Sequence, residues 1–305
     1  MRQKYNLLVH SVYIGAFLIY FQYVYMRDNV RRPIMQVNES ISLLIYPEPL
    51  DINDIFKIWL SEFKARDPQF QDFCTDAFQN GQGASQFSQD MWLFNNVFKE
   101  YAVTGKRGFY VDSGANDYRG LSNTFFFDVC LGWEGLCVEP SASYHEGIRK
   151  YRTCKLVTEC ISSSAASMTL HGDGGVGAFV TDGGSMPCLP LQTMLAEAGM
   201  RSHIDLWSLD VEGHELEVLS SVDYAKISVS VLLVEDFWVV QRLLDETILN
   251  APGSGLVKVH QFAIDSLYMH RNMSFPPKPW YPVNWQADMT SQKVFRDTVR
   301  DKLKC

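Results

Sequence analysis

The stretch Gly108-Phe-Tyr-Val-Asp-Ser-Gly-Ala-Asn116 decides the fold class, because a hydrophobic run passes directly into an acidic residue and a turn of small residues. Ligands of open α/β sheets bind at the carboxyl ends of the strands. Gly114 and Ala115 leave room for a bulky cofactor near the backbone, and Asp112 can bind its polar part. Dinucleotide binding is disfavoured, because a GxGxxG pattern is missing and the next glycine is Gly120.

Short β-rich runs alternate with helical runs after Gly105, which predicts a mostly parallel sheet covered by helices on both faces. The predicted strands are Phe109–Asp112, Leu136–Glu139, Lys155–Ile161, Leu206–Asp210, Val229–Glu235, Leu256–Phe262 and Ser266–His270. The predicted helices are Ser122–Leu131, Tyr144–Tyr151, Leu191–Ala198 and Glu215–Val222. The last strand follows its predecessor too closely for a helix between them, so we expect it to return antiparallel as a hairpin.

The second strand ends in Val138-Glu139-Pro140, one strand–helix–strand unit after Asp112. A carboxylate at that position can accept hydrogen bonds from both ribose hydroxyls of an adenosine-type ligand. The alternative for Glu139, and equally for Asp112, is an ordinary turn carboxylate.

Five blocks, taken together and in this order, resemble the FkbM family of methyltransferases. They are Val111–Asp117, Leu121–Thr124, Gly132–Pro140, Cys160–Ser162 and Ile204–Glu215. The resemblance implies a class I methyltransferase (Rossmann-like) fold, with a seven-stranded sheet whose last strand is antiparallel.

The same resemblance implies S-adenosylmethionine as cofactor. It places Asp112, Gly114, Asn116 and Glu139 around that cofactor, and we assign Ala115, Ile161 and Asp210 to the same site. One departure is Tyr118-Arg119, where the family pattern leads us to expect a further glycine. The conformation of that loop therefore stays open.

The block Ser208–Gly213 ends the fourth strand, where the methyl group of the cofactor would lie. Methyl transfer needs alignment and a base near the attacking hydroxyl, and Asp210, Glu212 and His214 are the candidates for this catalytic role. Glu212 could instead cap the helix that begins near His214. We expect O-methylation of a hydroxyl on a glycan, a lipid-linked sugar or a small metabolite. The rival is a membrane-anchored trafficking or scaffold protein that keeps the fold without catalysis.

A metal site is a further hypothesis, because the fifth strand ends in Glu235-Asp236 beside the strand that ends at Asp210. In position only, this arrangement resembles the catechol-type O-methyltransferases, in which such acids hold Mg²⁺. The predicted ligands are Asp210, Glu235 and Asp236. Alternatively, Glu235 and Asp236 cap or pair with the next helix, and at most one of two adjacent strand residues reaches the site.

The segment Leu7–Met26 contains no Asp, Glu, Lys or Arg, and as a helix it would reach roughly 30 Å, enough to span a bilayer. A buried helix and a cleaved signal peptide are the alternatives. We expect residues 1–27 to form a cytoplasmic tip and a single transmembrane anchor, 28–100 a stem and helical lead-in, 101–285 the methyltransferase domain and 286–305 a helical tail. The sequons at Asn38 and Asn272 slightly favour a lumenal domain in the Golgi or endoplasmic reticulum.

Charge, cysteine spacing and one glycine-rich segment limit the classes of partner and site that the chain can have. The net charge of −8 argues against a nucleic-acid partner, because phosphates need a concentrated basic face. The seven cysteines lack paired CxxC spacing, so we expect most of them to be buried small hydrophobes, with one or two disulfides left open. The segment Gly172–Gly177 lacks the Gly-Lys-Ser/Thr of a phosphate loop and reads as a hairpin or lid.

Overall fold

A computed structural model describes residues 67–171, 179–237 and 239–274, all within one compact unit. The expected anchor Leu7–Met26, most of the expected stem and the expected tail 286–305 lie outside these residues. Within the described ranges, no helix is both long enough and apolar enough to cross a membrane.

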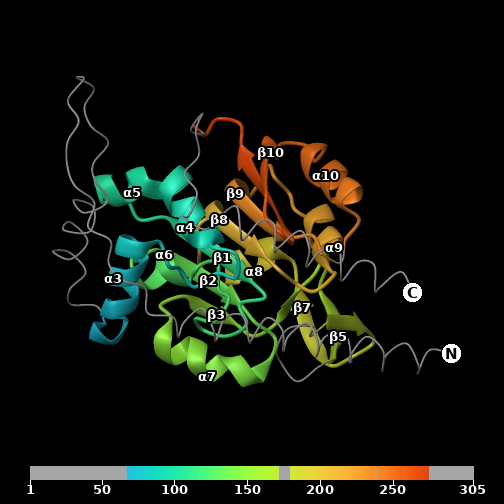
Figure 1. Cartoon of the computed structure of the whole chain (residues 1–305). Coiled ribbons are helices and arrows are strands. Elements are labelled where there is room, and N and C mark those ends of the chain that lie inside the picture. Colours follow the sequence, from blue (N-terminus) through green and yellow to red (C-terminus); the bar gives the residue numbers. More distant parts are fainter. Residues whose placement is uncertain (1–66, 172–178, 238, 275–305) are drawn as a thin grey trace, which may run out of the picture. The chain divides into compact units, whose positions relative to one another are not determined.

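A seven-stranded sheet forms the centre of this unit, with strand order β10-β11-β9-β8-β1-β2-β3 (Figure 1). Five neighbouring strands pair in parallel, in the order β9, β8, β1, β2 and β3. The strand β11 is antiparallel to both β9 and β10. This confirms the predicted hairpin and the mostly parallel sheet. The strands are β1 Phe109–Ser113, β2 Glu134–Val138, β3 Lys155–Val157, β8 His203–Leu209, β9 Ser228–Glu235, β10 Leu256–Gln261 and β11 Asp265–His270.

Two hydrophobic clusters lie on opposite faces of this sheet. Successive side chains of β1 point to opposite faces, so Tyr110 belongs to one cluster and Phe109 and Val111 belong to the other. Helices contribute to both clusters, as predicted, and in Figure 1 α3, α5 and α6 lie on the other side of the sheet from α9 and α10. The helices are η1 Pro68–Phe70, α3 Gln71–Asn80, α4 Gln89–Leu93, the π-helix η2 Phe94–Phe98, α5 Lys99–Thr104, α6 Phe125–Val129, α7 Ala142–Tyr151, α8 Leu191–Glu197, α9 Glu215–Ser220 and α10 Gln241–Leu249.

A second, four-stranded sheet was not predicted. Its order is β4-β7-β5-β6, with β4 Cys160–Ile161, β5 Ala166–His171, β6 Phe179–Asp182 and β7 Met186–Leu189. The prediction of one strand over Lys155–Ile161 is therefore wrong, because β3 pairs with β2 whereas β4 pairs with β7. The strands β5 and β6, which flank the Gly172–Gly177 segment, pair antiparallel, as the hairpin interpretation expects.

Three disulfides correct the interpretation of the cysteines. The pairs are Cys74–Cys130, Cys137–Cys154 and Cys160–Cys188, so every cysteine in the described residues is paired. They join α3 to the residue after α6, β2 to the segment before β3, and β4 to β7. The sequence could not reveal these pairs, because their partners are 56, 17 and 28 residues apart and meet only in the folded chain.

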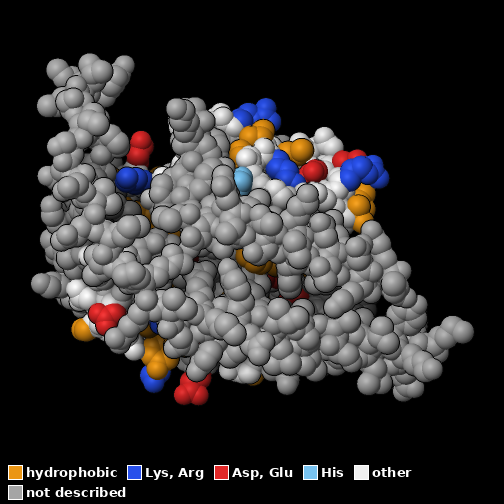
Figure 2. Space-filling view, viewed as in Figure 1, with side chains coloured by type: hydrophobic (Ala, Val, Ile, Leu, Met, Phe, Trp, Pro, Cys, Tyr) orange, Lys and Arg blue, Asp and Glu red, His pale blue; other side chains and the backbone are white. Residues whose placement is uncertain are grey.

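The surface near α10 and β10 mixes basic, acidic and hydrophobic side chains on the face that Figure 2 shows. Large exposed hydrophobic residues in this region are Val240, Leu243, Leu249 and Val257. Arg242 and Lys258 are each paired with an acid, Glu246 and Asp245 respectively.

Candidate functional site

The strand order reverses between β1 and β8, which lie side by side although β2, β3 and the whole second sheet separate them in sequence. In open α/β sheets such a switch point is where ligands bind. The turn after β1 is tightly held there, because Gly114 N donates to Val138 O at 2.9 Å and Asp210 N donates to Ser113 O at 3.0 Å.

Gly114 is required in this turn for two reasons. Its φ of +80° lies in the left-handed region that favours glycine, and a Cβ atom would overlap the carbonyl oxygen of Asp210. The small-residue turn that the sequence singled out therefore brings the end of β1 against the end of β8.

A cavity opens at this switch point. Of the predicted cofactor residues, five line it: Gly114, Asn116, Glu139, Ile161 and Asp210. All three predicted catalytic residues, Asp210, Glu212 and His214, line it too. The remaining lining residues are Val138, Pro140, Ser141, Tyr144, Cys160, Leu170 and Val211. The structure thus brings the ends of β1, β2, β4 and β8 to one site.

Glu139 directly follows β2 and is held from both sides by the backbone. Its Oε2 accepts from Asn116 N and its Oε1 from Ser141 N, each at 2.7 Å. An ionised carboxylate has about four lone-pair positions, so two remain for a ligand's hydroxyl groups. Burial raises the pKa of Glu139, and the two backbone donors partly offset this effect.

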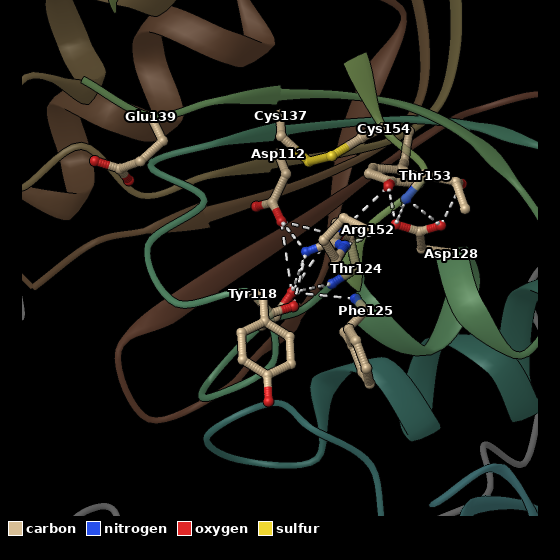
Figure 3. The surroundings of a disulfide bond; sticks show 12 residues. Asp112, Tyr118, Thr124, Phe125, Asp128, Cys137, Glu139, Arg152, Thr153 and Cys154 are labelled. Atoms are coloured by element: carbon tan, nitrogen blue, oxygen red, sulfur yellow. Dashed lines mark hydrogen bonds and ion pairs between the residues drawn. A yellow bond between two sulfur atoms is a disulfide. The ribbon is translucent and has the colours of Figure 1, made fainter. Parts of the chain in front are cut away.

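Asp112 and Ala115, also predicted to bind the cofactor, do not line the cavity. Asp112 shares a side of β1 with Tyr110, and its carboxylate accepts from Thr124 Oγ1 at 2.5 Å and lies 3.6 Å from Arg152. Figure 3 shows Arg152 between Asp112 and Asp128, with Glu139 pointing away from this group. Burial raises the pKa of Asp112, and the Arg152 charge opposes the shift. In this structure the Asp112 side chain therefore contacts Thr124 and Arg152 and does not line the cavity.

The turn after β8 carries the candidate catalytic groups in an unusual backbone conformation. Glu212 has a φ of +54°, in the left-handed region that non-glycine residues rarely adopt. Such strain is characteristic of functional sites, where the surrounding structure maintains it. His214 Nε2 lies 2.7 Å from Glu217 Oε2, so the imidazole has a carboxylate to orient it. The N-cap residue of α9 is His214, whose own side chain makes no capping hydrogen bond.

A cluster of three acids lies beside this turn: Asp210, Glu215 and Glu235. Burial and the neighbouring carboxylates raise the pKa values of Asp210 and Glu235 well above the usual range, and burial raises that of Glu215 to about 7. Asp236 is not part of this cluster. Its carboxylate accepts from Ser266 Oγ at 2.7 Å and Gln261 Nε2 at 3.0 Å, because adjacent residues at the strand end point in opposite directions.

Two residues at this site were missed from the sequence. Glu215 was taken only as the start of a helix, although an acid so soon after Asp210 could have drawn attention. Arg152 had no sequence signal, because its partners Asp112, Thr124 and Asp128 come from two other segments.

The sheet order, the switch-point cavity and the strand-end carboxylate define a Rossmann-like α/β ligand-binding domain. Residues 112–242 match the family model of the methyltransferase FkbM domain, which confirms the resemblance drawn from the sequence blocks. The match runs from the end of β1 into α10 and includes every lining residue of the cavity. The chain therefore carries an FkbM methyltransferase domain. Among curated proteins, no sequence matches this chain.

Proposed function

We propose that this protein is an S-adenosylmethionine-dependent methyltransferase that methylates a hydroxyl group of a glycan, a lipid-linked sugar or a small metabolite. The observation that carries the proposal is Glu139, which lines the switch-point cavity with free acceptor positions on its carboxylate. An adenosine ribose presents two adjacent hydroxyls, which match those positions. The FkbM domain match supports the same reaction class.

In the proposed reaction, the acceptor oxygen forms a bond to the methyl carbon while the carbon–sulfur bond breaks. S-adenosylhomocysteine leaves, and the hydroxyl proton passes to a base. His214 is the favoured base, because it lines the cavity and is paired with Glu217. Asp210 is the second candidate, since its carboxyl group follows β8 and lines the same cavity.

The domain belongs on the oxidising side of a membrane in this proposal, with Leu7–Met26 as a single-pass anchor. Disulfides persist in secretory compartments and are rare in the cytosol, and the described residues contain three. Asn272 of the second sequon is exposed in the turn after β11, where a glycan can be attached. A Golgi or endoplasmic reticulum location satisfies both observations.

Isothermal titration of the detergent-solubilised full chain with S-adenosylmethionine tests the proposal. We expect binding, and we expect Glu139→Ala to weaken it about 10- to 100-fold, the effect of losing hydrogen bonds to a charged group. Glu146→Ala is the matched control, because Glu146 is an exposed acid on α7. Unchanged affinity in Glu139→Ala would remove Glu139 from the site. No binding by the native chain would favour the scaffold alternative.

A further inference from the structure

Three carboxylates from separate parts of the chain meet at the end of the sheet. Asp210 directly follows β8, Glu235 ends the adjacent strand β9, and Glu215 begins α9. One oxygen from each lies within 4.8 Å of the other two. The fold therefore gathers three acidic groups that are not neighbours on any one element.

The hydrogen bonds of Glu215 provide an independent observation. Glu215 is fully buried, and its Oε1 accepts from Val211 N at 2.9 Å and from Gly213 N at 3.1 Å. These two bonds hold the carboxylate in one orientation, while its Oε2 has no hydrogen-bond partner among the described residues. Buried oxygens without a partner are rare, and each one requires an explanation.

Each of the other two acids also has one such oxygen. Asp210 Oδ1 and Glu235 Oε2 are also buried without a hydrogen-bond partner in the described part of the chain, and Glu235 is only 7% exposed. The charged groups that act on Asp210 include the further acids Glu212 and Asp265. Concentrated negative charge away from water is costly unless a cation or bound protons compensate it.

We propose that Asp210, Glu215 and Glu235 bind one divalent cation of the hard, oxygen-preferring class, such as Mg²⁺ or Mn²⁺. At the Mg²⁺–oxygen distance of about 2.1 Å, two ligands on opposite sides of the ion are about 4.2 Å apart, and for Ca²⁺ this separation approaches about 5 Å. The three carboxylate oxygens all lie within 4.8 Å of one another, a spacing within reach of the ligands of one such ion.

This ligand set differs from the one expected from the sequence, since Glu215 replaces Asp236. Asp210 also lines the switch-point cavity, so a cation bound to it would lie at the cavity wall. Water or an acceptor hydroxyl could then occupy a remaining coordination position, and the cation would lower the pKa of that hydroxyl. Only this role in catalysis rests on the proposed function. Cation binding itself does not.

Titration of the full chain in detergent with Mn²⁺, followed by electron paramagnetic resonance of the free ion, tests the site. We expect one tightly bound Mn²⁺ per chain, competition by Mg²⁺, and at least tenfold weaker binding in Glu215→Gln and Glu235→Gln. Both substitutions keep the side-chain shape, and in Glu215→Gln the introduced amide oxygen can still accept the backbone hydrogen bonds. Asp236→Asn is the control from the same strand end and should bind Mn²⁺ like the native chain.

No Mn²⁺ binding by the native chain would overturn the site and leave protons as the compensating charge. Equal binding in native, Glu215→Gln and Glu235→Gln chains would overturn it as well. Unfolding midpoints in chelator show whether each variant is folded, and a folded variant with weak Mn²⁺ binding supports the site. S-adenosylmethionine titration of the same samples separates the two proposals. Cofactor binding without Mn²⁺ binding refutes the metal site alone, whereas Mn²⁺ binding without cofactor binding refutes the proposed function alone.

Discussion

Arg152 is the best position for testing whether the buried charges beside β1 stabilise the fold. Its side chain is fully buried and lies 2.7 Å from Asp128, 3.6 Å from Asp112 and 2.6 Å from Thr124 Oγ1, with a further hydrogen bond to Tyr110 OH at 3.1 Å. Replacing it by methionine keeps the apolar volume but leaves two buried acids without their cation. Breaking a buried ion pair on one side costs about 3–5 kcal/mol, so we expect Arg152→Met to lower the free energy of unfolding by that amount.

Urea denaturation followed by circular dichroism, with the disulfides intact, measures this change. In thermal unfolding of a domain of 150–250 residues, the same loss lowers the midpoint temperature by roughly 6 to 20 °C. Arg149→Met is the control, because Arg149 is exposed on α7, which ends just before Arg152, and should change stability little. The double variant Arg152→Met/Asp128→Asn should recover part of the loss, since one uncompensated charge is removed. A loss below about 1 kcal/mol in Arg152→Met would refute the argument that this charge network stabilises the fold.

Four other predictions concern the disulfides, pH, the membrane and glycosylation. Replacing Cys74 and Cys130 together by alanine should lower the free energy of unfolding by about 4 kcal/mol in the chain-entropy model, measured by urea denaturation, and an unchanged midpoint would contradict the pairing. Burial lowers the pKa of His260 to about 4, so the unfolded state gains a proton first and stability should fall as pH drops from 6.5 to 4. His260→Phe should remove that part of the pH dependence. If the stability of the native and variant chains falls in parallel between pH 6.5 and 4, His260 is not its cause. The anchor at Leu7–Met26 should resist carbonate extraction and dissolve in detergent, whereas release by carbonate would exclude it. Glycosidase treatment should shift the mobility of the native chain, and Asn272→Gln should reduce the shift if that sequon is used.

The sequence alone determined the strand–helix alternation, the antiparallel hairpin and the small-residue turn at Gly114. These features are local, because hydrophobic periodicity and turn residues act over a few positions of the chain. The acid at the end of β2 could be assigned to the cavity in the same way, since the carboxyl ends of parallel strands lie at one edge of the sheet. Glu139 lines that cavity in the structure.

Only the tertiary structure decided which acid faces which partner. Asp112 lies 3.6 Å from Arg152, and Glu215, not the expected Asp236, is grouped with Asp210 and Glu235. A strand pattern shows that neighbouring side chains alternate in direction, but it does not show what packs against either face. The disulfides and the buried charges were hidden for the same physical reason: each depends on groups far apart in the chain that meet only when the sheet and its helices are packed together.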